Sequence, residues 1–204
     1  MNSPLIIAFD GPAASGKGTL AAAIAADYGL PCLDTGLLYR AVGHIAQTKN
    51  IDPALAAAHI DADLLADAVL RGRHAGELAS RVAAIPEVRA ALWQYQVDFA
   101  RQPGGAVLDG RDIGTVIAPD APVKLFVTAA PEVRAARRWK QLVQANPALT
   151  LDEVLEDIRI RDARDSSRSS APLEKAADAL LLDTTDLGIE AAIATARSLV
   201  KSRL

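Results

Sequence analysis

The stretch LIIAFDGPAASGKGT, residues 5–19, joins an apolar run to a glycine-rich loop. Its first five residues show no polar alternation, which is typical of a strand buried on both faces of a parallel sheet. Gly11 and Gly16 allow the loop to turn tightly with its backbone N–H groups toward a ligand. A helix-forming segment rich in alanine follows Thr19, and the positive end of a helix dipole stabilises an anion. This order of strand, loop and helix predicts a phosphate-binding P-loop.

The loop also indicates which ligand it holds. Lys17 is placed to reach the outer phosphates of a nucleoside triphosphate. Gly18 follows the lysine and the hydroxyl belongs to Thr19, whereas the common pattern has Ser or Thr directly after the lysine. This GKGT form resembles the nucleoside monophosphate kinases more than the GTPases or motor ATPases. The alternative is an ordinary strand-to-helix turn that binds nothing. We predict that ATP is bound by Gly11, Pro12, Ala13, Ala14, Ser15, Gly16, Lys17, Gly18 and Thr19.

Length and composition limit the class of protein. A chain of 204 residues is long enough for one domain with a full core. Its net charge of −3 argues against a protein that coats nucleic acid. The lone cysteine, Cys32, excludes a disulfide framework and lies in an apolar setting, so we expect a small buried residue and a reducing compartment. The N-terminus does not resemble a signal peptide, and no apolar run reaches membrane-spanning length. We expect a cytoplasmic monomer.

The rest of the chain alternates apolar runs with helical patterns. Four further strands are predicted at residues 30–33, 106–108, 123–128 and 179–182. Helices are predicted at residues 37–48, 61–70, 77–84, 86–100 and 131–146, from 151 onward and from 187 onward. Asp34 or Thr35 is expected to cap the second helix. Strands separated by helices predict an α/β fold, a five-stranded parallel sheet flanked by helices, with ligands at the carboxyl ends of the strands.

Two polar clusters follow predicted strands. Arg40 lies one to two helical turns past the second strand, either within reach of an anion or as a solvated surface residue. Asp109 closes the third strand, as a Walker B aspartate does when it holds the magnesium shell, and Arg111 could clamp a phosphoryl group. In the alternative interpretation Asp112 caps a helix and Asp109 only fixes a turn.

A third cluster is rich in arginine. Arg161, Arg164 and Arg168 are spaced three and four apart, so they share one face of a continuing helix. Asp157 and Asp165 offset part of their repulsion, and an anionic ligand would offset more. The segment alone would be read as a solvated, partly disordered end of a helix. Beside a P-loop it indicates a kinase lid, which excludes water and brings arginines to a phosphoryl group.

Five motifs resemble those of the bacterial cytidylate kinases, in order along nearly the whole chain: GPAASGKGT, LDTGLLYR, LDGRDIGT, RDARDSSRSSAPL and LLLDTT. The resemblance implies one P-loop kinase domain over residues 1–204, with a monophosphate-binding region at 36–102 and a short lid at 151–172. It implies transfer of the γ-phosphoryl group of ATP, with Mg²⁺ as cofactor, to CMP or dCMP.

The resemblance also implies site residues. The acceptor nucleotide would face Thr35, Arg40, Ser80, Arg89, Arg111, Asp112, Arg161, Asp165 and Arg168. The catalytic set would be Lys17, Arg40, Arg111 and Arg161, and Thr19 and Asp109 would hold the metal directly or through water. A carboxylate such as Asp112 can accept a hydrogen bond from the exocyclic amine of cytosine, where uracil presents a carbonyl. Asp165 could take ribose hydroxyls.

One departure and two alternatives accompany this interpretation. Family members usually carry a small antiparallel β insertion in the monophosphate region, but no alternating pattern is visible between residues 41 and 79. The departure therefore leaves open whether Arg71 contacts a phosphate group. The first alternative is a P-loop kinase for AMP or a hydroxy acid, and a hydroxyl acceptor would need a base. The second is a nucleotide-binding switch without transferase activity, although the guanine-reading N-K-x-D order is missing from residues 49–52.

Overall fold

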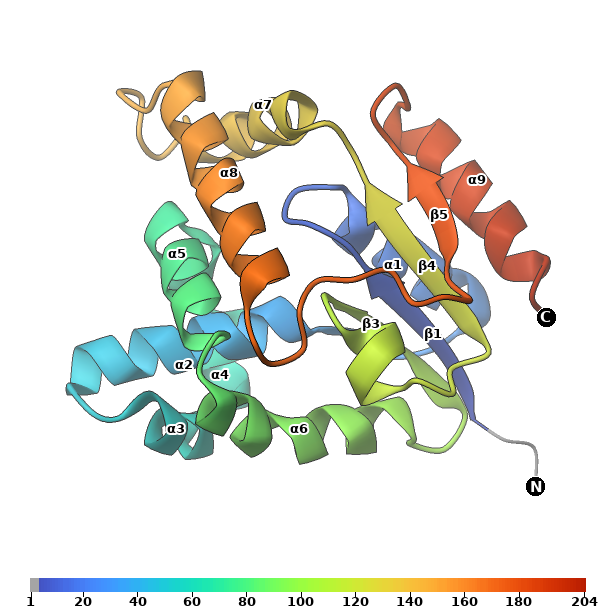
Figure 1. Cartoon of the computed structure of the whole chain (residues 1–204), viewed down its shortest axis with the longest axis horizontal. Coiled ribbons are helices and arrows are strands. Elements are labelled where there is room, and N and C mark those ends of the chain that lie inside the picture. The colour runs from blue at the N-terminus through green and yellow to red at the C-terminus, as the bar shows by residue number, and fades with distance from the viewer. Residues whose placement is uncertain (1–3) are drawn as a thin grey trace.

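The computed structural model describes residues 4–204 and is built on one parallel sheet (Figure 1). The strands lie in the order β2-β3-β1-β4-β5, and every neighbouring pair is parallel. Their bounds are β1 Leu5–Asp10, β2 Cys32–Asp34, β3 Gly105–Gly110, β4 Val123–Thr128 and β5 Leu180–Asp183. The predicted five-stranded parallel sheet is confirmed, and the strand predicted at residues 123–128 has those bounds.

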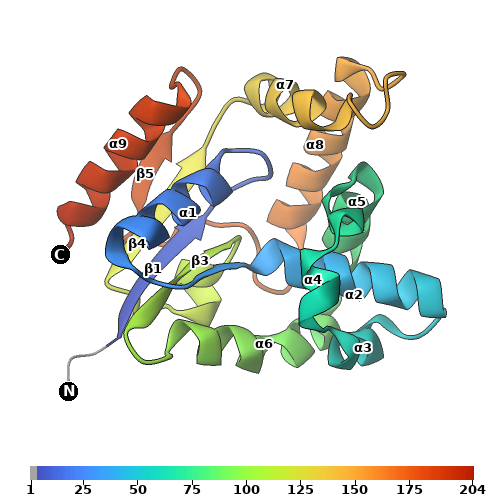
Figure 2. The same ribbon diagram turned by 180° about the vertical axis from the view of Figure 1, so that it is seen from behind.

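Helices surround the sheet (Figure 2). The α-helices are α1 Lys17–Tyr28, α2 Thr35–Lys49, α3 Pro53–Ala56, α4 Ala62–Ala66, α5 Arg73–Val82, α6 Pro86–Ala100, α7 Pro131–Leu142, α8 Leu151–Ser167 and α9 Ile189–Lys201. The shorter turns are η1 Ala57–His59 and η2 Ala68–Arg71, both 3₁₀, and η3 Ile113–Ile117, which is π-helical. Residues 41–79 contain no strand within the described chain, so the expected absence of a β insertion agrees with the structure.

Local sequence explains several helix ends. Pro86 and Pro131 stand at the first positions of α6 and α7, where a missing N–H costs nothing. Thr150 and Glu153 form a capping box at the start of α8. Gly29 ends α1 in the left-handed conformation, with its N–H returned to the carbonyls of the last turn.

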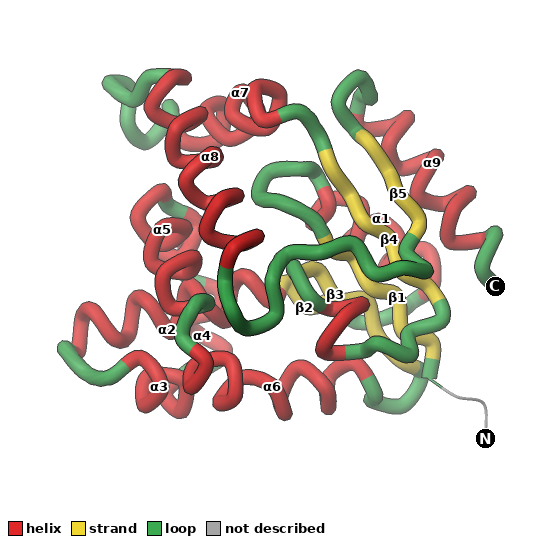
Figure 3. The backbone as a smooth tube through the Cα atoms, viewed as in Figure 1, coloured by secondary structure: helices red, strands yellow, loops and turns green. Residues whose placement is uncertain are grey.

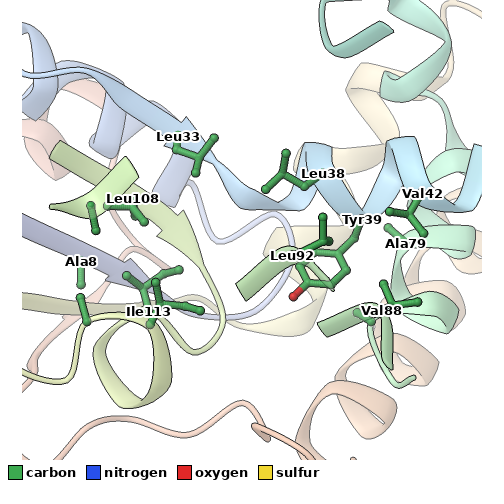
Figure 4. Packing of buried hydrophobic residues seen from close by; sticks show 14 of the residues in the cluster. Ala8, Leu33, Leu38, Tyr39, Val42, Ala79, Val88, Leu92, Leu108 and Ile113 are labelled. Carbon is green, nitrogen blue, oxygen red and sulfur yellow. The ribbon is translucent and has the colours of Figure 1, made fainter. Parts of the chain in front are cut away.

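Alternating side chains of β1 divide the core into two layers. Ile6 and Ala8 face a cluster shared with α2, α5, α6 and η3, part of which is drawn in Figure 4. Ile7 and Phe9 face the opposite cluster, which includes residues of α1 and α9. Because successive side chains of a strand point to opposite faces, an uninterrupted apolar run serves both layers.

Some local predictions were wrong at the sheet edge. Cys32 is exposed, because β2 is an edge strand from which only Leu33 packs into the core. The second helix begins at Thr35, and neither Asp34 nor Thr35 caps it through a side chain. The Thr35 hydroxyl instead donates to the backbone oxygen of Asp109, 2.9 Å away, which ties α2 to the end of β3.

Two helical units face each other beyond the carboxyl ends of the strands. Helices α5 and α8 lie side by side in both views (Figures 1 and 2). The chain then returns from α8 to β5 through a long irregular segment, drawn as a green tube in Figure 3. None of the helices in residues 4–204 is both long enough and apolar enough to cross a membrane.

The core predicts a stability difference between two apolar positions. Phe9→Ala should lower the free energy of unfolding by about 3–5 kcal/mol, because the ring is fully buried between the sheet and α1. Leu181→Ala, at a side chain 58% exposed, should change it by less than about 0.5 kcal/mol. Urea unfolding of both variants measures the difference, and equal losses would contradict this description of the core.

Candidate active site

A cleft of about 1060 Å³ opens at the carboxyl ends of the strands. Residues 13–19 of the glycine-rich loop form one wall, and parts of α7, α8 and α9 form others. Asp34 and Asp109 line it from the ends of β2 and β3. The predicted loop residues Gly11 and Pro12 are buried and do not line the cleft. The parallel sheet thus gathers the loops at one edge, as expected.

The loop keeps the tight conformation predicted for it. A side chain at Gly11 would place its Cβ 1.9 Å from the Val127 oxygen, and Gly16 has a φ of 93°. The Lys17 amine donates to the Pro12 oxygen at 3.3 Å and lies 3.5 Å from Asp109 Oδ1. Burial lowers the pKa of Lys17 to about 8, and the charge of Arg111 acts in the same direction.

The displaced hydroxyl of the GKGT form has a steric reason. A Cβ on residue 18 would lie 3.0 Å from Asp109 Oδ2, which is closer than side chains normally approach. Glycine at position 18 lets the Asp109 carboxylate come up to the loop beside Lys17. The hydroxyl is left to Thr19, which is exposed to the cleft.

Asp109, Asp34 and Thr19 fit a hard divalent cation. Asp109 Oδ1 is buried without a hydrogen-bond partner among the described residues. Burial raises the pKa of Asp109, and the nearby Asp34 carboxylate adds to that rise. Two neighbouring carboxylates and a hydroxyl are oxygen ligands of the kind that Mg²⁺ accepts together with phosphates and water. Asp34 is a candidate that the sequence did not suggest, since Asp34 or Thr35 was expected there only to cap a helix.

Three guanidinium groups converge above Gly76 of α5. Arg161 Nη1, Arg138 Nη2 and Arg40 Nη1 lie 3.7, 3.8 and 3.9 Å from the point where a Cβ on Gly76 would stand. Arg40 Nη1 also donates to the Leu70 oxygen at 2.8 Å. Burial lowers the pKa of Arg161 to about 9, and the charge of Arg111 adds to that effect.

A second, smaller cavity adjoins the cleft. It is lined by eight of the nine predicted acceptor residues: Thr35, Ser80, Arg89, Arg111, Asp112, Arg161, Asp165 and Arg168. The ninth, Arg40, lines the larger cleft, which Ser80, Arg111 and Arg161 also reach. Residues from α2, α5, α6, α8 and the end of β3 therefore meet at one place, although they are separated by up to 133 positions in sequence (Thr35 to Arg168).

Ion pairs fill this smaller cavity. Arg89 Nη2 donates to Asp112 Oδ2, and Arg168 Nη2 lies 3.6 Å from Asp112 Oδ1. Arg111 Nε donates to Asp165 at 3.1 Å. The remaining volume is about 30 Å³, roughly that of one water molecule. A nucleobase can enter only after these side chains move. Asp112 does not cap η3, so that alternative from the sequence was wrong.

The sequence predicted that Arg161, Arg164 and Arg168 share one face of a helix, but in the structure their side chains contact different groups. Arg161 points into the cleft, and its Nε is buried without a hydrogen-bond partner. Arg164 donates to the Ser80 hydroxyl at 3.0 Å. Arg168 stands just past the end of the helix in an extended conformation, which turns it toward Asp112.

Asp10 is an important residue that the sequence did not single out. It ends β1 directly before the loop, and its two carboxylate oxygens accept the N–H groups of Ile113 and Gly114 at 2.8 and 2.7 Å. Burial raises the pKa of Asp10 to about 7. The contact joins the glycine-rich loop to the segment that carries Arg111. These hydrogen bonds could not be predicted from the sequence, because an aspartate before a glycine does not indicate a contact with residues about one hundred positions away.

Arg134 is a second residue missed in the sequence. Its guanidinium donates to the Ala13 oxygen of the loop at 3.2 Å, to the Ala129 oxygen at 2.8 Å and to Asp162 of α8 at 2.6 Å. It therefore fixes α8 relative to the loop. The sequence predicted a helix from residue 131 but singled out none of its arginines.

Comparison with known proteins identifies the class and then the family. Solved structures with similar folds include a gluconokinase from Sinorhizobium meliloti, with a TM-score of 0.54 and 14% identity, covering 100% of this chain and 95% of that one. An uncharacterized protein from Eubacterium ventriosum has a TM-score of 0.57 and 13% identity, covering 98% and 99%. At such identities the likeness concerns the fold alone, which is that of the P-loop kinases.

Sequence relatives are much closer. The family model for cytidylate kinase matches residues 7–67 and 58–202. A cytidylate kinase of Xanthobacter autotrophicus is 57% identical, covering 98% of each chain, and one of Caulobacter sp. strain K31 is 56% identical, covering 97% of this chain and 94% of that one. The chain belongs to the cytidylate kinase family. The predicted family and the predicted enzyme class, a kinase, are confirmed.

Asp10 predicts a pH-dependent difference in stability. Its pKa is about 7 in the folded chain against an ordinary 3.8, so the folded state holds a proton that the unfolded state has lost. The stabilisation is complete below about pH 4 and is lost as the pH rises through 7. The free energy of unfolding of the wild type minus that of Asp10→Asn should therefore fall by at most about 4 kcal/mol between pH 4 and 7. Urea unfolding across this range measures the difference, and a flat profile would contradict the assignment.

Proposed function

We propose that the chain transfers the γ-phosphoryl group of ATP to CMP or dCMP, giving ADP and CDP or dCDP. The observation that carries this proposal is the match of nearly the whole chain to cytidylate kinases at more than half identity. The geometry supports it, because a phosphate-binding cleft adjoins a cavity lined by the residues predicted to face the acceptor. This is the activity predicted from the sequence.

In the proposed mechanism no general base is needed. The second pKa of a phosphate monoester is about 6, so the acceptor is mostly a dianion at neutral pH. Lys17 and the loop N–H groups hold the donor phosphates, and Arg40, Arg111 and Arg161 surround the group in transfer. Catalysis then consists of positioning and charge stabilisation.

Mg²⁺ belongs to this proposal as the cofactor that accompanies ATP. Thr19 and Asp109, joined by Asp34, would hold it directly or through water. The Asp109 oxygen Oδ1, which accepts no hydrogen bond among the described residues, supports this assignment. Bound there, the ion would neutralise charge on the donor phosphates.

Acceptor recognition follows from the carboxylates of the small cavity. Asp112 would accept the exocyclic amine of cytosine, and Ser80 would donate to the base. Burial raises the pKa of Asp112, and the charges of Arg89 and Arg168 oppose that rise. Asp165 would accept ribose hydroxyls. Its burial raises its pKa, but Arg111, Arg161 and Arg168 together outweigh that effect, so the pKa of Asp165 is lowered. Because about 30 Å³ is too little for a base, binding of CMP requires the side chains around Asp112 to separate.

Residues 36–102 would act as the monophosphate-binding region and residues 151–172 as the lid. A bidentate pair between Arg73 of α5 and Asp157 of α8, at 2.5 and 2.9 Å, joins the two across the mouth of the cleft. The proposal also includes a monomer as the active form. We also propose that the chain is cytoplasmic, which its lone cysteine supports, and that it binds neither nucleic acid nor membranes. Its small net negative charge supports the absence of a nucleic-acid partner.

The test of the proposed function is ADP release with ATP and each of CMP, dCMP, UMP and AMP. We expect release to depend on CMP or dCMP and to be slower with UMP, because its carbonyl faces Asp112. Preference for AMP, or phosphorylation of a hydroxy acid, would favour the first alternative. Slow hydrolysis that no acceptor accelerates would favour a nucleotide-binding switch.

Removing either cation that faces the phosphates should slow turnover. Lys17→Ala and Arg111→Ala should each lower kcat by roughly 10³-fold, because their charges stabilise the group in transfer. Arg101→Ala is the matched control, since this exposed arginine pairs only with Asp120 and lies outside both cavities. Steady-state ADP release measures all three, and a kcat near wild type for Lys17→Ala or Arg111→Ala would overturn the assignment.

A further inference from the structure

Arg138 of α7 lies in the cleft but has no part in the mechanism above. Its Nη2 donates to the backbone oxygens of Arg71 and Gly72, at 3.1 and 3.2 Å, and its Nη1 donates to the side chain of Gln141 at 3.1 Å. The side chain lines the same cleft as the glycine-rich loop. Arg138 thus reaches from the core of the kinase to the start of α5.

The Arg138 guanidinium lacks a carboxylate partner of the kind that Arg134 has. Arg134, one turn earlier on α7, is paired with Asp162, whereas no carboxylate of residues 4–204 forms an ion pair with Arg138. Burial lowers the pKa of Arg138 to about 10, and the nearby charge of Arg40 adds to the effect. A partly buried cation beside another cation is costly unless an anion joins it.

The position of Arg138 shows where that anion would be. Together with Arg40 and Arg161 it surrounds the point above Gly76, each guanidinium approaching to within 4.0 Å. Three different helices, α2, α7 and α8, contribute these groups. The carbonyl oxygens of residues 70–72 hold two of the three arginines but carry no net charge. These oxygens accept hydrogen bonds from Arg40 and Arg138 but do not neutralise their positive charges.

We propose that Arg138 is a further catalytic residue, whose guanidinium contacts the oxygens of the phosphoryl group during its transfer. The assignment rests on the proposed function. In this step an oxygen of the acceptor phosphate bonds to the γ-phosphorus, the bond to the β–γ bridging oxygen breaks, and ADP leaves with that electron pair. Arg138 keeps its proton throughout and supplies charge and a planar pair of donors.

A purely structural role makes a different prediction. If Arg138 only ties α7 to the residues before α5, then a neutral hydrogen-bond donor should serve nearly as well as a cation. The variants Arg138→Gln and Arg138→Lys separate the two roles, because glutamine keeps donor groups without charge and lysine keeps the charge without the planar fork. Arg159→Ala is the matched control: Arg159 also ties α8 to α7, through Glu132 at 3.5 Å, but lies outside the cleft.

The experiment compares these variants and Arg138→Ala by three readouts: kcat, the affinity for ATP and for CMP separately, and the affinity for CMP with ADP and aluminium fluoride, which mimics the group in transfer. We expect kcat of Arg138→Ala to fall by about 10²–10³-fold, with the loss mirrored in the aluminium fluoride complex and separate nucleotide affinities changed by less than about threefold. Arg138→Lys should retain more activity than Arg138→Gln, and Arg159→Ala should match the wild type.

Two results would overturn the role of Arg138. The first is a kcat of Arg138→Ala within threefold of the wild type. The second is equal activity of Arg138→Lys and Arg138→Gln, with a lowered melting temperature and no selective loss of the aluminium fluoride complex. A wild-type enzyme that releases no ADP in response to CMP would instead contradict the proposed function. If it uses another acceptor, the same comparison with that acceptor still tests Arg138.

Discussion

The site depends on an excess of positive charge, because the cleft holds more cationic than anionic side chains. Arg40 and Arg138 rest on backbone oxygens, and Arg161 shares Asp165 with Arg111. Partly buried guanidinium groups that lie close together repel one another, and an anion between them offsets this cost. Phosphate groups meet this need, because their oxygens accept the planar donor pairs of arginine. The cleft is therefore electrostatically complete only with its ligands.

The parallel sheet explains how the donor and acceptor sides are held in register. Asp10 and Asp109 lie at the carboxyl ends of neighbouring strands. The Asp10 carboxylate accepts hydrogen bonds from the backbone N–H groups of Ile113 and Gly114, which follow Asp109 in the chain. Arg134 fixes α8 to the glycine-rich loop. These hydrogen bonds join the glycine-rich loop to the segment that carries Arg111 and to α8, so the donor and acceptor sides of the proposed site are fixed relative to one another.

Much of the fold could be predicted from the sequence, because apolar runs between glycine and proline mark buried strands. The strand at residues 123–128 and the helix at 86–100 have the predicted bounds. Cys32 could not be placed, since nothing in its local pattern shows that β2 lies at the sheet edge. Eight of the acceptor residues predicted from the motifs meet at one cavity. Asp10, Asp34, Arg134 and Arg138 escaped notice because their roles depend on contacts distant in sequence.

The central claim is that one chain holds two phosphorylated nucleotides end to end across a cation-rich cleft. Calorimetric titration with a dinucleotide that joins cytidine and adenosine through five phosphates tests it most directly. We predict one molecule bound per chain, with an affinity at least about 10²-fold higher than that for ATP or CMP alone, because one ligand fills both sites. Two molecules per chain, or an affinity no higher than that for ATP, would contradict the account.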